Sequence, residues 1–340
     1  MFEDFRPYLT PYRLGRPVLA GSGVPGRFDA RGVDVPFVFY HNGRFMMMYT
    51  GFDGTGYQTA LAQSDNLTDW RTLGVILPRK SDGSWDAVGA SGTWMLKADD
   101  SIGVLPTLQK YNGRYWMIYH SYPSAGYEEG PAEIGLAWCE DEDLMLWTRL
   151  EQPVLSWRGG ADWERGGLYK GCLVRDGGFF RLFYNAKTEG ENWIEQTGMC
   201  VSEDMIHWTR CAQNPILPVT PGGWDSRFAS DPCMLRDGKR WLMFYYGYDG
   251  RHAQDGLTVS EDLTRWEKAA QPLLTYGAPG SLDSIHAHKP AILTVNGRLY
   301  HFYCACREHR PDDAAELWNE FRTITVASSE PFDADEKERL

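Results

Sequence analysis

The chain has 340 residues, of which 43% are hydrophobic and 24% charged, a globular composition that fits one large domain or two smaller ones. Its formal net charge of −12 excludes nucleic acid as the main partner, because phosphate binding requires a basic face. No run reaches the roughly 18 apolar residues of a membrane span, and residues 1–19 lack the pattern of a signal peptide. We therefore expect no membrane partner and a cytoplasmic protein, or an exported one whose signal segment has been removed. Seven cysteines without CxxC spacing favour reduced thiols.

Hairpin turns recur along the chain between alternating apolar residues, as Asn-Gly or Asp-Gly pairs in "YHNGRF", "KYNGRY", "VRDGGF", "LRDGKR" and "TVNGRL". An aromatic-rich strand follows each turn, for example "FMMMYTG" at residues 45–51. A loop and a third strand come next, and in the first four units that strand runs on to a tryptophan: Trp70, Trp147, Trp208 and Trp266. Short segments, "GVIL", "QPVL", "NPIL" and "QPLL", then supply a fourth strand. The pattern predicts repeated units of four antiparallel strands.

These repeats predict an all-β fold, a five-bladed β-propeller with four antiparallel strands per blade. We expect one catalytic domain over residues 1–340, with blade cores at 34–77, 104–155, 169–217, 230–274 and 288–328. The last unit lacks a fourth strand, and "RPVL" at residues 16–19 matches the fourth strands of the other units. We expect this N-terminal strand to complete the last blade, which removes an open sheet edge. A two-sheet sandwich would explain the strand count but not the fivefold repeat.

An acidic residue precedes the first strand of every unit, in the set Asp29, Asp86, Glu164, Asp225 and Asp283. Because every unit has one, we interpret these acids as structural, with each carboxylate accepting hydrogen bonds from backbone N–H groups of the following turn.

The residues that differ between units lie immediately before the first strand: Asp34-Val35, Val104-Leu105, Tyr169-Lys170, Ser230-Asp231 and His288-Lys289. In a propeller, the innermost strands start near the central axis, so these dipeptides are expected to converge on one face. Structural burial would favour apolar residues, whereas most of this set is polar. A convergent polar cluster in a concave funnel predicts a binding or catalytic site. The loops between second and third strands open on the same face, and they add Glu129 and Glu308 as candidates.

The chain resembles the five-bladed propeller glycoside hydrolases, a superfamily that includes families 32, 43, 62, 68, 117 and 130. The resemblance rests on Asp34 before "VPFVFYHNGRFMMMYTG", on "SDPCMLRDGKRWLMFYYG" at 230–247 and on "HKPAILTVNGRLYHFYCA" at 288–305. It implies that Asp34 is the general base or nucleophile and that Asp231 orients the sugar or tunes a neighbouring pKa. Families 32 and 43 place an acid-catalyst glutamate where this chain has Tyr169 and Lys170. Family 117, which has a histidine as its acid candidate, implies that role for His288.

Cleavage of a glycosidic bond needs one group that protonates the leaving oxygen and one that activates water or attacks the anomeric carbon. We predict a glycosidase acting on a small oligosaccharide or glycoside, exo-acting and inverting, with Asp34 as base, His288 as acid and Asp231 holding sugar hydroxyls or tuning a neighbour. Glu129 and Glu308 are alternative acids. The predicted substrate-binding residues are completed by Tyr169, Lys170, Lys289 and Arg227, and the two lysines suit a substrate that carries an acidic group.

Two other functions stay open. Lys170, Lys289, His288 and Arg227 could bind phosphate in a glycoside phosphorylase, and the missing glutamate of the third unit suits a carbohydrate-binding propeller without activity. We predict no cofactor and no metal ligand, with a central calcium or zinc ion near His286 and His288 as the alternative. The sequence predicts no oligomeric state.

Overall fold

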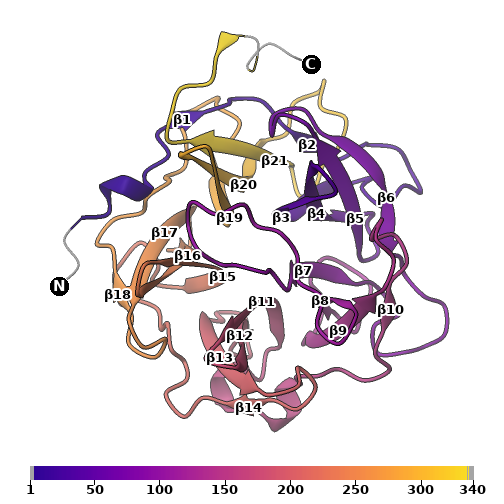
Figure 1. Ribbon diagram of the computed structural model, residues 1–340. Coiled ribbons are helices and arrows are strands. Elements are labelled where there is room, and N and C mark those ends of the chain that lie inside the picture. Colours follow the sequence, from indigo (N-terminus) through magenta and orange to yellow (C-terminus); the bar gives the residue numbers. More distant parts are fainter. Residues whose placement is uncertain (1–3, 335, 337–340) are drawn as a thin grey trace.

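A computed structural model describes residues 4–334 and 336, and its strands form successive antiparallel groups around a common centre (Figure 1). The first group contains β3 (Gly32–His41), β4 (Arg44–Phe52), β5 (Tyr57–Ser64) and β6 (Arg71–Leu77), and the second contains β7 (Ser91–Met95), β8 (Tyr115–Ser121), β9 (Glu133–Cys139) and β10 (Thr148–Arg149). The third contains β11 (Leu168–Asp176), β12 (Phe179–Lys187), β13 (Glu195–Ser202) and β14 (Thr209–Arg210).

The fourth group contains β15 (Phe228–Asp237), β16 (Arg240–Tyr248), β17 (Ala253–Ser260) and β18 (Glu267–Lys268), and the last contains β19 (His286–Val295), β20 (Arg298–Glu308) and β21 (Glu320–Ser328). Parallel pairings of β13 with β15 and of β17 with β19 join the last three groups into one extended sheet. Three short 3-10 helices complete the described elements: η1 (Arg6–Tyr8), η2 (Trp157–Gly159) and η3 (Asp162–Glu164). The all-β prediction is confirmed.

The N-terminal segment pairs with the last strand of the chain. Both β1 (Tyr12–Arg13) and β2 (Leu19–Ala20) lie antiparallel to β21, and the Val18 N–H donates to the Ile324 carbonyl at 2.8 Å. The prediction that residues 16–19 complete the last group is therefore confirmed in its pairing. The contact extends further than predicted, because β1 adds a second short pairing upstream.

The repeated acids are buried, as a structural role requires, but their partners differ from the prediction. In four groups a buried tyrosine of the second strand donates its hydroxyl to the acid: Tyr119 to Asp86, Tyr184 to Glu164, Tyr245 to Asp225 and Tyr303 to Asp283. A basic residue of the outer strand forms an ion pair with the same acid: Arg149, Arg210, Lys268 and, from the N-terminal segment, Arg13. The acids thus tie the second strand of each of these groups to its outer strand rather than capping a turn.

The second group departs from the predicted boundaries. The predicted first strand at Val104-Leu105 is wrong: the first strand of this group is β7, and Val104 and Leu105 are 44% and 37% exposed. Residues 96–108 instead run across the ends of the inner strands, where the Tyr40 N–H donates to the Pro106 carbonyl and the Ile102 N–H donates to the Arg236 carbonyl. The hairpin turn at 111–114 resembles the turns that directly follow first strands, which explains the misplacement.

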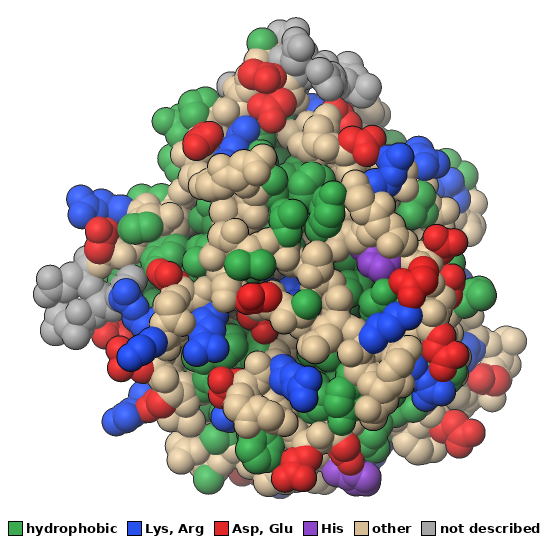
Figure 2. Space-filling model, in the orientation of Figure 1, with side chains coloured by type: hydrophobic (Ala, Val, Ile, Leu, Met, Phe, Trp, Pro, Cys, Tyr) green, Lys and Arg blue, Asp and Glu red, His purple; other side chains and the backbone are tan. Residues whose placement is uncertain are grey.

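Figure 1 shows the chain after β7 crossing the centre of the ring on the side facing the viewer. Figure 2 shows the same face with its side chains, where acidic and basic groups are interspersed rather than gathered by sign. Among the described residues, no helix is long and apolar enough to cross a membrane.

Candidate active site

A pocket lies at the end of the inner strands opposite the crossing segment 96–108, and five elements of the predicted cluster contribute to it. Its lining includes Val35, Tyr169, Lys170, Asp231, His288 and Lys289, with Arg227 at one side. The structure thus brings together most of the residues that the repeat comparison singled out. Asp34, Glu129 and Glu308 do not line this pocket.

A β-bulge at the start of four inner strands aims side chains into the pocket. Register shifts follow Asp34, Tyr169, Ser230 and His288, so that two residues of each inner strand have no partner opposite. The first unpaired residue has a positive φ in each case: 54° at Val35, 49° at Lys170, 56° at Asp231 and 65° at Lys289. A bulge bends its strand and redirects a side chain, and strained backbone of this kind clusters at functional sites. The bulge therefore accounts for the convergence of Lys170, Asp231 and Lys289.

Asp34 is 2% exposed and lies beside the pocket as a counter-ion for two buried cations. Its Oδ2 accepts from Lys289 Nζ at 2.7 Å and from Arg322 Nη1 at 3.2 Å, while its Oδ1 accepts from the Cys304 thiol at 2.6 Å. Burial alone would favour the neutral acid, but the charges of Lys289 and Arg322 outweigh it and hold the pKa of Asp34 far below its usual value. Both oxygens are engaged, so this carboxylate is fully ionised and occupied.

Asp231 is a buried carboxyl group with one uncommitted oxygen. Asn185 donates its side-chain amide to Oδ1 and accepts from the Asp231 N–H at 2.8 Å, whereas Oδ2 is buried without a hydrogen-bond partner among the described residues. Burial raises the pKa of Asp231 to about 6, opposed by the nearby charges of Lys170 and Lys289 and reinforced by Glu195. Asp231 can therefore carry a proton near neutral pH.

Glu195 lies next to Asp231 and accepts hydrogen bonds from three side chains. Its Oε1 accepts from Trp193 Nε1 at 3.0 Å, and its Oε2 accepts from Ser230 Oγ at 2.9 Å and Tyr246 Oη at 3.3 Å. Burial raises the pKa of Glu195 despite these donors. Two neighbouring buried carboxyl groups titrate as a pair, so Asp231 and Glu195 together hold a proton more readily than either would alone.

Three histidines line the pocket, and their partners fix the position of the proton in each neutral ring. Nδ1 of His120 accepts from the Lys170 N–H at 3.3 Å, and Nδ1 of His286 accepts from the Ala253 N–H at 3.0 Å, so both rings carry their proton on Nε2. Nδ1 of His288 lies 3.1 Å from the Cys304 carbonyl and must donate to it, which leaves Nε2 as an acceptor.

The same three rings are neutral at physiological pH. Burial lowers the pKa of His120 and of His286 to about 3, and burial with the charges of Arg322 and Lys289 places the pKa of His288 well below its usual value. A neutral His288 with its proton on Nδ1 has no proton to give on the Nε2 side. It is suited to accept a hydrogen bond from a sugar hydroxyl.

Two loop glutamates were predicted one position or one strand away from the residues that reach the pocket. Glu129 is exposed, whereas its neighbour Glu128 lines the pocket and accepts from Tyr57 Oη at 2.8 Å. Glu308 is exposed, whereas Glu320, paired with it across β20 and β21, lines the pocket. Glu128 has a φ of 57°, and this local backbone turn decides which glutamate points inward. Glu195 belonged to a loop rich in acids, and no sequence signal set it apart.

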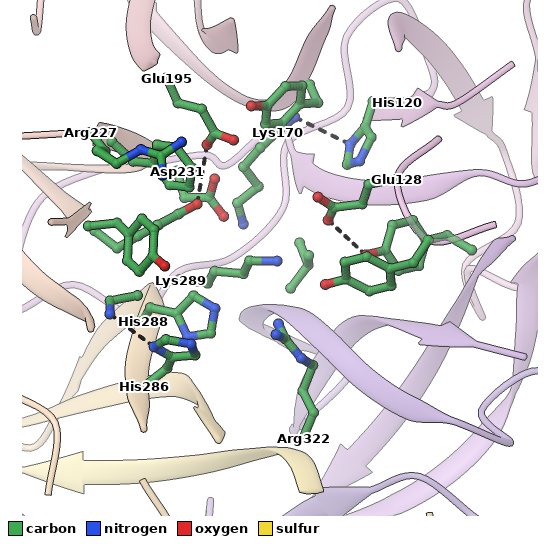
Figure 3. A pocket seen from close by; sticks show the side chains of 18 of the residues that line it. His120, Glu128, Lys170, Glu195, Arg227, Asp231, His286, His288, Lys289 and Arg322 are labelled. Atoms are coloured by element: carbon green, nitrogen blue, oxygen red, sulfur yellow. Dashed lines mark hydrogen bonds between the residues drawn. The ribbon is translucent and has the colours of Figure 1, made fainter. Parts of the chain in front are cut away.

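Figure 3 shows the arrangement of the charged groups. Asp231 and Glu195 lie on one side of the cavity, Glu128 lies on the opposite side, and the ammonium groups of Lys170 and Lys289 point into the space between them. Tyrosines fill much of the remaining wall: Tyr57, Tyr122, Tyr127, Tyr169, Tyr246 and Tyr248. Within residues 4–334 and 336, no group of three or more His, Cys, Asp and Glu side chains is placed to hold a metal ion.

This all-β ring with a carboxylate-lined pocket at its centre is the arrangement of a propeller glycoside hydrolase. A family model described as the glycosyl hydrolases family 32 N-terminal domain matches residues 106–281, just over half of the chain. The chain therefore belongs to this family, and with it to the propeller glycoside hydrolases, and it is a glycosidase. Solved structures of families 43, 117 and 130 share the fold at 13–17% identity and TM-scores of 0.59–0.67, so the superfamily is the level that all the comparisons share.

Two solved structures are similar over nearly the whole chain. One, a complex of BT0996 with RGII, is 30% identical with a TM-score of 0.80, and the match covers 95% of this chain and 93% of BT0996. Another, described as a glycoside hydrolase, is 28% identical with a TM-score of 0.81 over 98% of this chain and 97% of its own.

Curated relatives are more distant. An uncharacterized protein of Mycobacterium tuberculosis, MT1551, is 24% identical over 72% of this chain and 77% of its own length. The 1,2-beta-oligomannan phosphorylase of a Thermoanaerobacter species is 27% identical over 35% of this chain, and the sucrose-6-phosphate hydrolase of Zymomonas mobilis is 27% identical over 46%. The chain spans less than half the length of these last two enzymes, 42% and 31% respectively.

Proposed function

We propose that this protein hydrolyses the terminal glycosidic bond of an oligosaccharide, with Glu128 on one side of the bond and the Asp231–Glu195 pair on the other. The observation that carries the proposal is the pairing of a carboxyl group whose pKa is raised to about 6 with a second carboxylate across the same cavity. Environments that differ in this way separate a general acid from a base or nucleophile.

In the proposed reaction, the Asp231–Glu195 pair donates its proton to the leaving oxygen as the bond breaks. Glu128, held by the Tyr57 hydroxyl, deprotonates a water molecule that attacks the anomeric carbon from the opposite face. This route inverts the configuration of the sugar. His288 accepts a hydrogen bond from a sugar hydroxyl, His120 donates one, and Asp34 keeps Lys289 and Arg322 in place instead of serving as the base.

The shape of the pocket supports an exo-acting enzyme. Segment 96–108 covers the ends of the inner strands on the opposite face, so the centre of the ring is not an open channel. A blind pocket accepts the end of a chain rather than its middle. We take the five antiparallel groups as the five blades of the propeller, with the N-terminal segment completing the last.

The charge of the pocket favours water over phosphate as the attacking group. Of its four cations, Lys289 and Arg322 are committed to Asp34, and the lining also includes Glu128, Glu195, Asp231 and Glu320. A phosphate dianion would meet at least as many carboxylates as free cations. Phosphorolysis remains the alternative because of the Thermoanaerobacter relative, and the same assay separates the two.

Lys170 supports a substrate that carries an acidic group. It is 3% exposed, no ion pair is formed by its ammonium group among the described residues, and that group faces the cavity beside the Nε2–H side of His120. A substrate carboxylate would supply the missing counter-ion. We expect Lys170→Met to reduce kcat/KM for an acidic substrate by roughly 100-fold and for its neutral analogue by less than about threefold.

The direct test is release of product from a panel of nitrophenyl furanosides, pyranosides and uronides, each with and without inorganic phosphate. Hydrolysis predicts turnover that is independent of phosphate, with inverted product configuration by proton NMR at the earliest time points. Turnover that requires phosphate would establish phosphorolysis. Binding of a sugar without turnover, and no difference between the wild type and Glu128→Gln, would favour a carbohydrate-binding protein without activity.

A further inference from the structure

The mouth of the pocket carries a tryptophan that the repeat does not require. Trp318 lies in the connection between β20 and β21, lines the pocket and is 65% exposed. Its ring meets Tyr127 of the loop between β8 and β9 edge to face, with centroids 4.4 Å apart. Two segments that are almost 200 positions apart in the chain thus form one aromatic surface at the rim.

The backbone beneath Trp318 is strained. Leu317 and Glu320 pair as the ends of a two-residue turn, in which Trp318 and Asn319 have φ values of 55° and 63°. Two successive positive φ values define the hairpin turn that strongly prefers Asn-Gly or Gly-Gly. At its other turns with two positive φ values, this chain follows that preference: Asn42-Gly43, Asn112-Gly113, Gly177-Gly178 and Asn296-Gly297. A bulky aromatic residue in this position is an outlier that a purely structural turn does not explain.

The loop is tied down on both sides of the tryptophan. Arg307 forms an ion pair with Asp313, and the Asn319 N–H donates to Glu316 Oε1 at 2.5 Å. Leu317 is buried in a cluster that includes Phe52 and Tyr122, while the next residue, Trp318, is held outward. The indole is therefore presented by a fixed support rather than by a loose loop tip.

We propose that Tyr127 and Trp318 form a stacking platform for the sugar ring on the leaving-group side of the bond that is cleaved. This assignment rests on the proposed glycosidase function. The buried polar groups hold the terminal sugar, so the next ring emerges at the mouth, where the aromatic surface is exposed. Sugar rings present apolar C–H faces, and a preorganised aromatic side chain contacts such a face at low entropic cost. The substrate class is accordingly an oligosaccharide with at least two sugar rings.

The test compares Trp318→Ala with Phe179→Ala, an exposed aromatic residue that does not line the pocket. Binding of sucrose, β-1,2-mannobiose, xylobiose and digalacturonic acid is measured by calorimetry on Glu128→Gln background protein, beside the methyl glycoside of each terminal sugar. We expect the best-bound disaccharide to lose roughly tenfold in affinity with Trp318→Ala, and the methyl glycosides and the Phe179→Ala protein to be unaffected. Trp318→Tyr should recover part of the loss.

Equal disaccharide affinity in Trp318→Ala and wild-type backgrounds would overturn the platform, and so would failure of all four disaccharides to bind. Because the readout is binding, it separates this proposal from the catalytic one. Disaccharide binding that depends on Trp318, without turnover by the wild type, would retain the platform and reject the hydrolase.

Discussion

Lys289 Nζ lies 2.7 Å from Asp34 Oδ2, although 255 positions separate the two residues in the sequence. The pair joins the first inner strand, β3, to the last, β19, directly below the pocket. The pocket charges are therefore set by contacts between groups at opposite ends of the chain.

Replacement of Asp34 by Asn should destabilise the protein by about 3–5 kcal/mol, because Lys289 and Arg322 would be left buried without their counter-ion. Urea unfolding measures this loss. The double variant Asp34→Asn with Lys289→Met should be less destabilised than the two single effects predict. An Asp34→Asn protein of normal stability that has lost its activity would instead support the general-base role predicted from the sequence.

Activity should fall as the pH rises above about 6, because the pKa of Asp231 is raised to about 6 and the proposed donor must be protonated. The Asp231→Asn variant keeps an acceptor for Asn185 but has no proton to transfer, so kcat should drop roughly 10²- to 10⁴-fold. A pH profile of kcat for both proteins makes the comparison. An alkaline limb that persists unchanged in Asp231→Asn would assign the proton to another group.

Stability should also depend on Asp231. The folded protein keeps this proton between the ordinary aspartate pKa and about pH 6, whereas the unfolded chain releases it, so the free energy of unfolding falls as the pH rises through this range. The contribution is up to about 3 kcal/mol below that range. Thermal unfolding of Asp231→Asn should lack this part of the pH dependence, and an identical dependence in the variant would contradict the prediction.

Glu128→Gln should reduce kcat by roughly 10²- to 10⁴-fold with little change in stability, since Glu128 is only half-buried and its oxygen accepts one hydrogen bond from Tyr57. Glu129→Gln is the matched control, because the exposed neighbour does not line the pocket and should retain full activity. Steady-state kinetics on the best substrate of the nitrophenyl panel distinguishes them. Equal activity of both variants would exclude Glu128 as the base.

Leu14→Ala should destabilise the protein by about 2–5 kcal/mol, since Leu14 is 4% exposed in the N-terminal segment that pairs with β21. Tyr12→Ala, at a 44% exposed position of the same segment, should change the stability by less than about 0.5 kcal/mol. Differential scanning calorimetry of both variants tests whether the closing contact is part of the cooperative fold. Similar melting temperatures for the two would show that it is not.

The repeat allowed much of the fold to be predicted, and its limits explain what was missed. Comparison of equivalent positions singled out Lys170, Asp231 and Lys289, because a bulge at a common position aims all three into one cavity. The second unit was misplaced because residues 96–108 are inserted after its first strand and the turn that follows resembles the others.

The loop residues of the site could not be predicted in the same way. Glu128 and Glu129 are chemically identical neighbours, and only the backbone conformation at residue 128 decides which one faces the pocket. Asp34 was predicted as a base from the resemblance, but the choice between a free carboxylate and a counter-ion depends on Arg322, which comes from a strand nearly 290 positions away. Contacts of this kind have no local sequence signal.

The pairing of β1 and β2 with β21 also constrains how the chain can fold. The first segment to leave the ribosome has its partner in the strand made last, so it must stay unpaired while the intervening groups form. Contacts of such high sequence separation form late and slowly. The ring therefore closes in a final step, and conditions that trap residues 12–20 elsewhere would leave β21 with an exposed edge that can pair with a second chain.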